Sequence, residues 1–368
     1  MRITFVISSL GVGGAERVMV TMANYWAEKG WCVNLLTLDD GSKPPFYELH
    51  RAICHRALGI TGVSKTLYER IANNFRRTRV LRAAIRETSP NIVISFVSET
   101  NVLTILSTLG LEVPVIVEEH IDPHEQPIKR AWALLRRWSY PRATRVVVLT
   151  ERSLRYFSAS IQKRTRVIPN PTVMSLAPEI ENVSSSKREE KKIISMGRLH
   201  PQKGFDTLIQ VFAKVVAKHP HWKLEIWGDG PARQSLEGLA TKLGVQDRVS
   251  LRGITSQPFE KMRCADIFVL SSRYEGFPMV LCEAMACGLP VISFDCASGP
   301  REIIRDGIDG VLVPDGDVDA LANTMSRLMT DPQERLRLAK RAPEVLDRFG
   351  VHRVMAIWED LIREAVYA

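Results

Sequence analysis

Runs of apolar, β-branched residues alternate with longer segments of helical periodicity along most of the chain. In its first half, the apolar runs are RITFVI, VNLLTL, NIVISFV, VPVIVEE and RVVVLT. After residue 190 the alternation restarts, with KIISMG, KLEIWG, VSLRG, IFVLSS, PVISFD and GVLV. Continuous apolar runs separated by helices are typical of parallel strands that are buried on both faces. The pattern therefore predicts an α/β protein with two doubly wound, Rossmann-like domains that face a cleft.

The break between the two series of strands predicts the domain boundaries. The polar stretch APEIENVSSSKREEKK, residues 177–192, follows Pro169 and Pro171 and has the composition of a linker. We expect a first domain at residues 1–172, a linker at 173–192 and a second domain at 193–350. The amphipathic pattern at 351–368 predicts a last helix that packs back on the first domain.

Composition narrows the class of protein. Hydrophobic residues make up 45% of the chain and charged residues 25%, which is typical of soluble globular proteins. No apolar run approaches the roughly 20 residues needed to cross a bilayer, and MRITFVISSL is too short for a secretory signal. We therefore expect the protein in the cytoplasm. The six cysteines form no C-x-x-C pair, which predicts buried thiols rather than disulfides or metal ligands.

The basic charge is concentrated in the first half of the chain. Residues 1–186 hold 24 lysines and arginines against 16 acids, whereas the remaining residues hold 26 against 25. Such an asymmetry indicates an anionic partner for the first half. A nucleic acid, an anionic membrane or a phosphorylated substrate would each fit.

A glycine-rich turn, SLGVGGAER, follows the first predicted strand. Its glycines allow close backbone approach, and the next helix offers unpaired N–H groups to an anion. These glycines are Gly11, Gly13 and Gly14. A dinucleotide site would use Asp39 or Asp40 for the ribose, but it needs a small residue where Glu16 stands. The turn therefore disfavours NAD binding, although it leaves an NAD-dependent dehydrogenase as an alternative.

Two cations follow the first predicted strand of the second domain. Arg198 comes directly after KIISMG, and Lys203 lies five residues further on. A guanidinium and an ammonium group beyond one strand end suit a diphosphate. Without further context, such a pair is more often a solvated surface feature.

The segment EGFPMVLCEAMACG predicts a helix at about 278–287. Pro278 suits the first helical position and Gly288 the position just past the end. Glu275 then lies at the mouth of this helix, and Glu283 lies more than a turn inside it. Taken alone, the two acids would be a first-turn acid and a surface glutamate.

These motifs together resemble the retaining GT-B glycosyltransferases of the GT4 family. They are GGAER, the histidine after VIVEE, VIPNP, GRLHPQKG and EGFPMVLCEAMACGLPVI, and they occur in the family's order over essentially the whole chain. SSLGVGGAERVMVTMANYWAEKG and the arginine-rich segment 64–88 also resemble bacterial enzymes that extend polyprenyl-diphosphate-linked oligosaccharides. Among those enzymes is the processive N-acetylgalactosaminyl transferase of the N-glycan pathway. The resemblance implies the GT-B fold, with two Rossmann-like domains.

By the resemblance, the second domain would bind a nucleotide-sugar donor. The implied catalytic residues are His120, Glu275, Arg198 and Lys203. The implied donor-binding residues are Gly13, Gly14, Arg198, Lys203, Gly228, Arg252, Gly253, Gly276, Phe277, Pro278, Met279 and Glu283. Glu283 would hold the ribose hydroxyls, and Glu275 would face the sugar or the reacting centre. The two cations would neutralise the diphosphate, GDGP at 228–231 with Arg252 and Gly253 would flank the nucleobase, and His120 would contact the sugar.

The implied chemistry is glycosyl transfer with retention. It passes through an oxocarbenium-like state whose charge must be balanced while the nucleoside diphosphate departs. Protein cations would take the place of the metal that other transferases use, and DGD at 315–317 belongs to a late turn rather than to a metal-binding D-x-D. We expect neither a metal nor a cofactor. In the family's proposed mechanism, the departing phosphate oxygen takes the proton of the acceptor.

Segment 64–88 predicts a helix with an apolar stripe and a basic flank. The stripe consists of Leu67, Ile71, Thr78, Leu81 and Ile85, which we expect in the core. By the resemblance, the acceptor-binding residues would be Gly11, Glu16, Arg70, Arg76 and Arg77, with the arginines holding the diphosphate of a polyprenyl-linked acceptor. The alternative is a solvated basic face. Asn74 stands where the processive relative has a further cation, which argues against processivity.

A second basic segment, PIKRAWALLRRWSYPR at 127–142, carries two tryptophans. It suits contact with the anionic inner leaflet, where each nearby cation contributes about 1 kcal/mol. The alternative is a helix with Trp132 and Leu135 in the core.

The sequence thus predicts a retaining hexosyltransferase at the inner face of the cytoplasmic membrane. It would move a hexose or N-acetylhexosamine from a nucleoside diphosphate sugar, with uridine as the expected base, to a polyprenyl-diphosphate-linked glycan in cell-surface glycan assembly. A nucleotide-sugar epimerase of the same fold is the alternative. We expect no nucleic-acid partner, because no recognition motif accompanies the basic charge.

Overall fold

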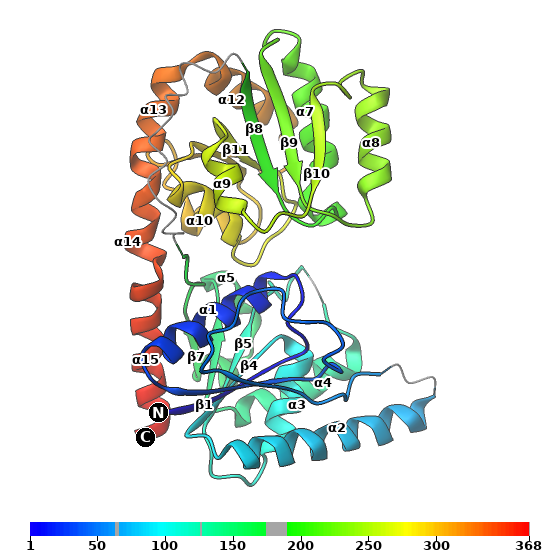
Figure 1. Cartoon of the computed structure of the whole chain (residues 1–368), viewed down its shortest axis with the longest axis vertical. Helices are drawn as coiled ribbons and strands as arrows, with labels where there is room; N and C mark the ends of the chain where they lie inside the picture. Colours follow the sequence, from blue (N-terminus) through cyan, green and yellow to red (C-terminus); the bar gives the residue numbers. More distant parts are fainter. Residues whose placement is uncertain (63–65, 126, 174–189, 368) are drawn as a thin grey trace. The chain divides into compact units, whose positions relative to one another are not determined.

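Each half of the chain is built on one parallel sheet. The computed structural model describes residues 1–367 apart from 63–65, 126, 174–189 and the side chains of Leu67, Tyr68, Arg70 and Ile71 (Figure 1). The first unit is Met1–Pro171 with His352–Ala368, and the second is Thr172–Val351. Most of the expected linker at 173–192 lies outside the described residues. Its last two positions begin a strand instead, because Lys191 and Lys192 pair with the neighbouring strand of the second sheet.

The first unit has a seven-stranded sheet in the order β3-β2-β1-β4-β5-β6-β7, all parallel. Its strands are β1 Arg2–Ile7, β2 Cys32–Thr37, β3 Cys54–Ala57, β4 Ile92–Phe96, β5 Val115–Glu119, β6 Arg145–Val148 and β7 Thr165–Val167. β4 and β5 are buried at every position, as their apolar runs predict. Strands β3 and β7 were not predicted, because both are short edge strands with no continuous apolar run.

Helices cover the first sheet and one returns from the end of the chain. They are α1 Gly14–Glu28, α2 Leu67–Thr88, α3 Ser98–Thr108, α4 Arg130–Ser139, α5 Glu151–Tyr156, α6 Ala159–Gln162 and α15 Val351–Tyr367, with the 3₁₀ turn η1 Tyr140–Arg142 (Figure 1). In α15, Glu359 pairs with Lys29, the C-cap residue of α1, at 2.6 Å, and Glu364 pairs with Arg166 of β7 at 3.0 Å. α15 buries Trp358 and Leu361 within this unit.

The second unit has a six-stranded parallel sheet in the order β10-β9-β8-β11-β12-β13. The strands are β8 Lys191–Met196, β9 Trp222–Trp227, β10 Val249–Gly253, β11 Ile267–Leu270, β12 Val291–Phe294 and β13 Val311–Val313. The helices are α7 Phe205–Val216, α8 Arg233–Lys242, α9 Pro258–Arg263, α10 Met279–Ala286, α11 Pro300–Ile303, α12 Val318–Thr330, α13 Pro332–Arg341 and α14 Val345–Phe349, with η3 Pro201–Lys203 and η4 Ala342–Glu344. Both units are doubly wound, as predicted.

In each sheet the strand order reverses beside the first strand, between β1 and β4 and between β8 and β11. Ligands of open parallel sheets bind beyond the carboxyl ends of the strands near such a reversal. We therefore expect ligand-binding residues in the loops after β1, β4 and β5 of the first unit and after β8, β9 and β11 of the second.

The cysteines are only partly as expected. Cys282 and Cys296 are buried, but Cys32, Cys54 and Cys264 are exposed, because they stand at the ends of elements, where the chain reaches the surface. No disulfide links any two of the six, all of which lie in the described part of the chain. Within the same described part, the helices fall short of the length and apolar character that a membrane span requires.

Candidate functional site

Glycines bring the loops after β8 and β9 of the second unit backbone against backbone. Gly228 has φ 140°, and a Cβ there would lie 1.9 Å from the carbonyl oxygen of Gly197. Gly230 has φ 157°, and a Cβ there would lie 2.5 Å from the carbonyl oxygen of Leu199. Both positions therefore require glycine. Gly228 also donates to the carbonyl oxygen of Gly253 at 2.8 Å, so the ends of three strands meet here.

The two predicted cations after β8 differ in their surroundings. Arg198 is exposed, and its guanidinium has no hydrogen-bond or ion-pair partner among the residues that the structure describes. Lys203 is largely buried, and its aliphatic stem runs beside Gly197. Lys203 Nζ lies 2.7 Å from Glu275 Oε1. The resemblance assigned Lys203 to the diphosphate and Glu275 to the sugar, and the contact between them was not predicted.

Glu275 is held by two donors at the mouth of α10. Its side chain is 7% exposed, and Oε1 accepts from Ser272 Oγ at 2.6 Å as well as from Lys203 Nζ. A buried carboxylate is costly to desolvate unless it is paired and hydrogen-bonded, and this one has both kinds of partner. The acid is therefore fixed in position before any ligand contacts it.

Further contacts join the loop that carries Lys203 to the loop that carries Glu275. Ser271 Oγ donates to the carbonyl oxygen of Lys203 at 2.9 Å, and Gln202 Nε2 donates to the carbonyl oxygen of Tyr274 at 3.0 Å. Gly204, with φ 61°, allows this approach, since a Cβ there would lie 2.0 Å from the carbonyl oxygen of Ser271. The two loops form one rigid support for the charged pair.

Helix α10 begins one residue later than predicted. It spans Met279–Ala286, and Pro278 is its N-cap rather than its first helical residue. Pro278 has ψ 90°, which is outside the helical range, so the first helical turn starts at the next residue. Gly288 follows the end with φ 74°, as predicted. Glu283 is 2% exposed on the second turn.

The residues around this helix mouth are packed from behind. Phe277 is buried, and its ring packs edge-on against Phe349 of α14 at 5.3 Å between centroids. Gly299 has φ 95°, and a Cβ there would lie 2.5 Å from Pro278 Cδ. Ser298 Oγ donates to the carbonyl oxygen of Gly276 at 3.3 Å. The side chain of Phe277 is thus a packing group.

Arg252 and Gly253, assigned together to the nucleobase, point to different places. Gly253 joins Gly228, whereas Arg252 Nη2 donates to Glu225 Oε1 of β9 at 3.1 Å. Lys192 Nζ lies 3.2 Å from the same oxygen. Burial tends to raise the pKa of Glu225, but the two cations outweigh it and lower that pKa. Arg252 thereby balances a carboxylate on the sheet.

In the first unit, His120 follows β5 and is nearly enclosed. Its side chain is 5% exposed, and its ring stacks on Phe96 at 4.8 Å between centroids. Its Nε2 lies 3.2 Å from Glu118 Oε1, and the Glu118 side chain is 1% exposed. The sequence predicted the histidine at this strand end but not its acidic neighbour.

Glu119 points to the opposite face of β5, as strand alternation requires. It accepts from Ser98 Oγ at 2.6 Å and from the Tyr140 hydroxyl, and Arg136 Nη1 lies 3.8 Å away. Burial, reinforced by the adjacent Glu119 charge, raises the pKa of Tyr140 well above its usual value. This cluster ties β5 to α3, α4 and η1.

The glycine turn after β1 places an acid at the start of α1. Gly13 is the N-cap with extended backbone, and a Cβ there would lie 2.0 Å from Glu16 Oε2. The first-turn carboxylate of Glu16 therefore lies beside Gly13, where it complements the positive end of the helix. Gly14 has open space on its Cβ side. The turn suits neutral hydroxyl groups better than the anion that its glycines alone predicted.

The arginines of α2 are not equivalent. Arg77 donates from Nε to the carbonyl oxygen of Ile60 at 2.8 Å and from Nη2 to that of Gly62 at 2.7 Å, so it anchors a loop. Arg76 is exposed, with no ion pair or hydrogen bond to its side chain in the described part of the chain. The side chain of Arg70 lies outside the described residues. Leu81 and Ile85 are buried, as predicted; the side chains of Leu67 and Ile71 are not described.

Helix α4 combines exposed apolar and basic side chains. Leu134, Leu135 and Trp138 are 70%, 36% and 45% exposed, so Leu135 is not the core residue that the alternative reading required. Trp132 does pack against the core. Arg136 is buried instead and donates to the Tyr156 hydroxyl at 2.9 Å.

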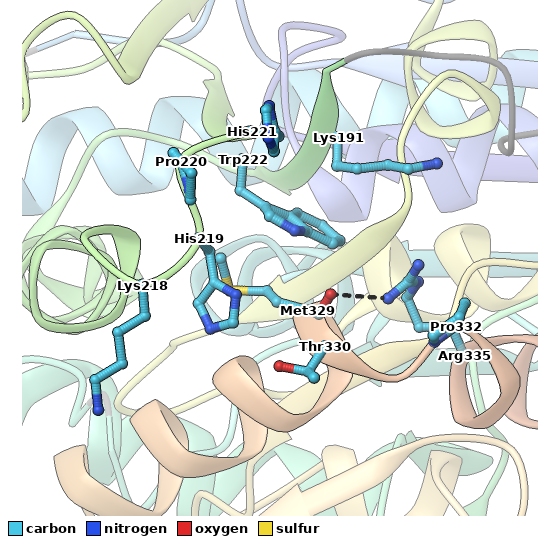
Figure 2. Close-up of a pocket in the computed structure, with 10 residues that line it drawn as sticks. All are labelled: Lys191, Lys218, His219, Pro220, His221, Trp222, Met329, Thr330, Pro332 and Arg335. Atoms are coloured by element: carbon cyan, nitrogen blue, oxygen red, sulfur yellow. Dashed lines mark hydrogen bonds between the residues drawn. The ribbon is translucent and has the colours of Figure 1, made fainter.

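A cavity of about 560 Å³ lies at the other edge of the second sheet, where β8 and β9 begin. Figure 2 shows its lining, which includes His219, Trp222 and Arg335. Arg335 Nη1 donates to the carbonyl oxygens of Leu328 and Met329, and its guanidinium lies 5.3 Å from the centre of the Trp222 ring. The cavity lies where α7 and α12 end, and cations there balance the helix dipoles. It lies at the edge of the sheet opposite to the loops after β8, β9 and β11.

Comparison with known proteins assigns both halves. Residues 12–174 match the model described as Glycosyltransferase Family 4, and residues 177–345 match that of Glycosyl transferases group 1. A Campylobacter jejuni protein is 30% identical over 370 residues, covering 99% of each chain. It is named GalNAc-alpha-(1->4)-GalNAc-alpha-(1->3)-diNAcBac-PP-undecaprenol alpha-1,4-N-acetyl-D-galactosaminyltransferase. An uncharacterized glycosyltransferase of Haemophilus influenzae is 25% identical over 363 residues, covering 98% of this chain and 99% of the other.

Solved structures show the same fold. The Anabaena protein Alr3699/HepE, in complex with UDP and glucose, superposes with a TM-score of 0.81 at 21% identity and 98% coverage of both chains. The apo form of the lipopolysaccharide outer core galactosyltransferase WaaB gives a TM-score of 0.77 at 21% identity and 99% coverage of both chains. At such identities, the likeness concerns the fold.

Proposed function

This chain belongs to glycosyltransferase family 4 and has the GT-B fold, and from that premise we propose that it is a retaining glycosyltransferase acting on a lipid-linked glycan. The donor is a uridine diphosphate hexose or N-acetylhexosamine. The acceptor is a polyprenyl-diphosphate-linked glycan, the kind of molecule that the name of the Campylobacter relative describes. A further relative, from Erwinia amylovora, is 25% identical over 354 residues and is named amylovoran biosynthesis glycosyltransferase AmsD.

The observation that carries the proposal is the charged group at the carboxyl edge of the second sheet. Arg198 is exposed after β8, and Lys203 is paired with Glu275 at the mouth of α10. Phosphate oxygens have a guanidinium to bind, and the sugar meets a fixed carboxylate. Backbone N–H groups at 276, 277 and 279 add donors at the start of the helix. Glu283 holds the ribose through its carboxylate.

These residues balance the charges of the reaction. The bond between the anomeric carbon and the phosphate oxygen breaks, and the nucleoside diphosphate leaves with the electron pair. The acceptor hydroxyl forms the new bond on the same face of the sugar and passes its proton to the departing phosphate oxygen. Arg198 and Lys203 stabilise the leaving group, and Glu275 and His120 contact the sugar. The protein cations make the reaction independent of a metal.

The first unit would bind the acceptor and the membrane. Gly11 and Glu16 offer a carbonyl group and a carboxylate to glycan hydroxyls, and Arg70 and Arg76 hold the lipid diphosphate. Arg77, which the resemblance also placed here, donates to the carbonyl oxygens of Ile60 and Gly62, whereas Arg76 is exposed and has no partner among the described residues. Exposed Leu134 and Trp138 of α4, beside basic residues of the same helix, suit an anionic inner leaflet.

The test measures the binding of nucleotide sugars first and the transfer of the sugar to an acceptor second. Uridine, guanosine and adenosine diphosphate sugars are added separately to the purified protein, because a ligand of the native state raises its melting temperature. We expect a uridine diphosphate sugar to give the largest shift and to be transferred to a polyprenyl-diphosphate-linked glycan. The product should keep the donor's anomeric configuration by NMR, at equal rates in magnesium and in excess chelator. Inversion would overturn the retaining mechanism, and sugar interconversion without an acceptor would indicate an epimerase.

A further inference from the structure

A row of aromatic rings in contact crosses the first sheet and ends at His120. Ring centroids are 5.8 Å apart for Trp26 and Phe5, 6.1 Å for Phe5 and Phe96, and 4.8 Å for Phe96 and His120. The first three residues are fully buried. The planes of Phe96 and His120 differ by 22°. Because Phe96 is fixed by the core, it also fixes the plane in which the imidazole lies.

Stacking fixes the plane of the ring but not which nitrogen faces outward. Glu118 and His120 are two positions apart, so both point to the same face of the sheet. Nε2 of His120 is buried without a hydrogen bond to the described residues, and it lies 3.2 Å from Glu118 Oε1, which is within ion-pair distance. This leaves Nδ1 as the ring nitrogen that does not face the carboxylate.

The Glu118 carboxyl group has no hydrogen bond to any residue that the structure describes, and its Oε2 is buried. Glu119, next along the strand, has a hydroxyl donor on each oxygen and Arg136 nearby. A buried carboxylate costs stability unless it is paired. The hydrogen bonds of Glu119 explain its burial, whereas the only charged partner of Glu118 among the described residues is His120. A carboxyl group that is buried without such hydrogen bonds, next to a histidine of the proposed site, indicates a functional role.

The backbone at Glu118 is clamped by a strained turn. Val97, directly after β4, has φ 74°, which a β-branched residue rarely adopts. Its N–H donates to the carbonyl oxygen of Glu118 at 3.2 Å, and Asn101 Nδ2 donates to the same oxygen at 2.8 Å. Strain of this kind persists only where the surroundings impose it, and it is concentrated at functional sites.

We propose that Glu118 is a positioning residue for His120. The negative charge of its carboxylate, at ion-pair distance from Nε2, keeps the proton of the imidazole on that nitrogen, so that Nδ1 is presented as a hydrogen-bond acceptor. A sugar hydroxyl is the group that such an acceptor binds. The inference rests on the proposed function, in which His120 contacts the donor sugar, and it adds the nitrogen that makes the contact and the residue that selects it.

The first experiment reads the tautomer directly. Long-range proton–nitrogen NMR of the imidazole side chains distinguishes a protonated Nε2 from a protonated Nδ1, and His120→Gln assigns the signal. We expect Nε2–H in the wild type. Glu118→Leu removes the acceptor and should give a mixture of tautomers, whereas Glu118→Gln keeps an acceptor oxygen and should keep Nε2–H. Glu119→Gln is the matched control, which should lower the melting temperature without changing the His120 signal.

The second experiment measures transfer. Glu118→Leu should lower kcat by on the order of 10-fold, the effect of an outer partner that orients a site histidine, and Glu118→Gln should restore most of the rate. In a His120→Ala background, Glu118→Leu should cause no further loss. Additive losses, or an unchanged tautomer in Glu118→Leu, would overturn the inference. If His120→Ala transfers normally while Glu118→Leu still shifts the tautomer, then the assignment of His120 to the sugar fails and the pairing stands.

Discussion

Lys203 Nζ lies 2.7 Å from Glu275 Oε1, so the cation proposed for the diphosphate and the acid proposed for the sugar form an ion pair at the mouth of α10. Arg198, after the same strand, is exposed and has no such partner among the described residues. Replacing each cation by alanine should therefore affect the stability of the protein differently, although both cations are proposed to balance the charge of the leaving group.

Arg198→Ala and Lys203→Ala should each lower kcat by on the order of 100-fold, because each removes charge stabilisation from the transition state. Only Lys203→Ala should also lower the melting temperature, since it leaves the Glu275 carboxylate buried without its cation. Initial rates and thermal unfolding of the two variants measure both effects. Near-normal rates in both would contradict the proposed donor site, and equal loss of stability would contradict the asymmetry.

Replacement of the two acids of the α10 region should change different kinetic constants, KM for the donor in one case and kcat in the other. Glu283→Gln keeps the shape of the side chain but weakens a charge-assisted bond to the ribose, which should raise KM for the donor about 10-fold. Glu275→Gln should lower kcat more than it changes KM, because the lost charge faces the reacting sugar. Steady-state kinetics with varied donor distinguish the two. If neither constant changes in either variant, the acids are structural.

Gly228 should tolerate no side chain, whereas Gly238 should accept one. In Gly228→Ala the new Cβ would meet the carbonyl oxygen of Gly197 at 1.9 Å, at φ 140°. We expect a loss of roughly 1–3 kcal/mol in unfolding free energy and weaker donor binding, because the loop must move. Gly238→Ala, on the exposed face of α8 with open space around it, should instead gain up to about 1 kcal/mol. Denaturant unfolding of both variants gives the comparison.

Much of the fold follows from local patterns, but the pairing of charges in the site does not. Every apolar run that was predicted to be a strand contains one, because burial on both faces demands such runs. Lys203 and Glu275 are 72 positions apart, and their contact depends on β8 and β11 being neighbours. Strand order is a tertiary property that no local window of the sequence carries.

The acids of β5 and the apolar face of α4 could have been predicted from the sequence. Two acids in the otherwise apolar strand VIVEE are a signal in themselves, and alternation assigns Glu118 to the face of His120 and Glu119 to the other face. The helical periodicity of α4 predicts an apolar face, but it does not show whether the rest of the protein packs on that face. Arg136 is buried there while Leu135 is exposed, because Tyr156 offers its hydroxyl and ring to the guanidinium.

The cysteines should fall into two classes of reactivity. Burial raises the pKa of Cys282 and of Cys296 to about 12, and that of Cys287 to about 11. Their thiolate fraction at pH 8 is therefore negligible, and only the thiolate reacts. Cys32, Cys54 and Cys264 are exposed. Alkylation at pH 8 with mass spectrometry should label these three in the native protein and all six after unfolding. Labelling of Cys282 in the native protein would contradict its burial.

The basic helix α2 provides a test of the lipid-linked acceptor. Two acceptors carry the same glycan, one on a diphosphate lipid and one on a neutral aglycone, and the ratio of their kcat/KM values measures the preference for diphosphate. We expect the wild type to prefer the lipid diphosphate and Arg76→Ala to reduce that ratio about 10-fold, the contribution of one hydrogen bond to a charged group. Arg86→Ala is the matched control, because Arg86 is equally exposed on the same helix but about 15 Å further along its axis.

Arg77→Ala should behave differently from Arg76→Ala. Arg77 donates to the carbonyl oxygens of Ile60 and Gly62, so its removal should lower the melting temperature and reduce transfer to both acceptors alike. A fall in the ratio with Arg77→Ala but not with Arg76→Ala would show that Arg77 leaves the loop to bind phosphate. If neither variant, nor Arg70→Ala, changes the ratio, the arginines of this helix are surface charges and the acceptor is recognised elsewhere. If the wild type prefers neither acceptor, the proposed polyprenyl diphosphate is wrong, whereas the donor site after β8 and β11 is unaffected.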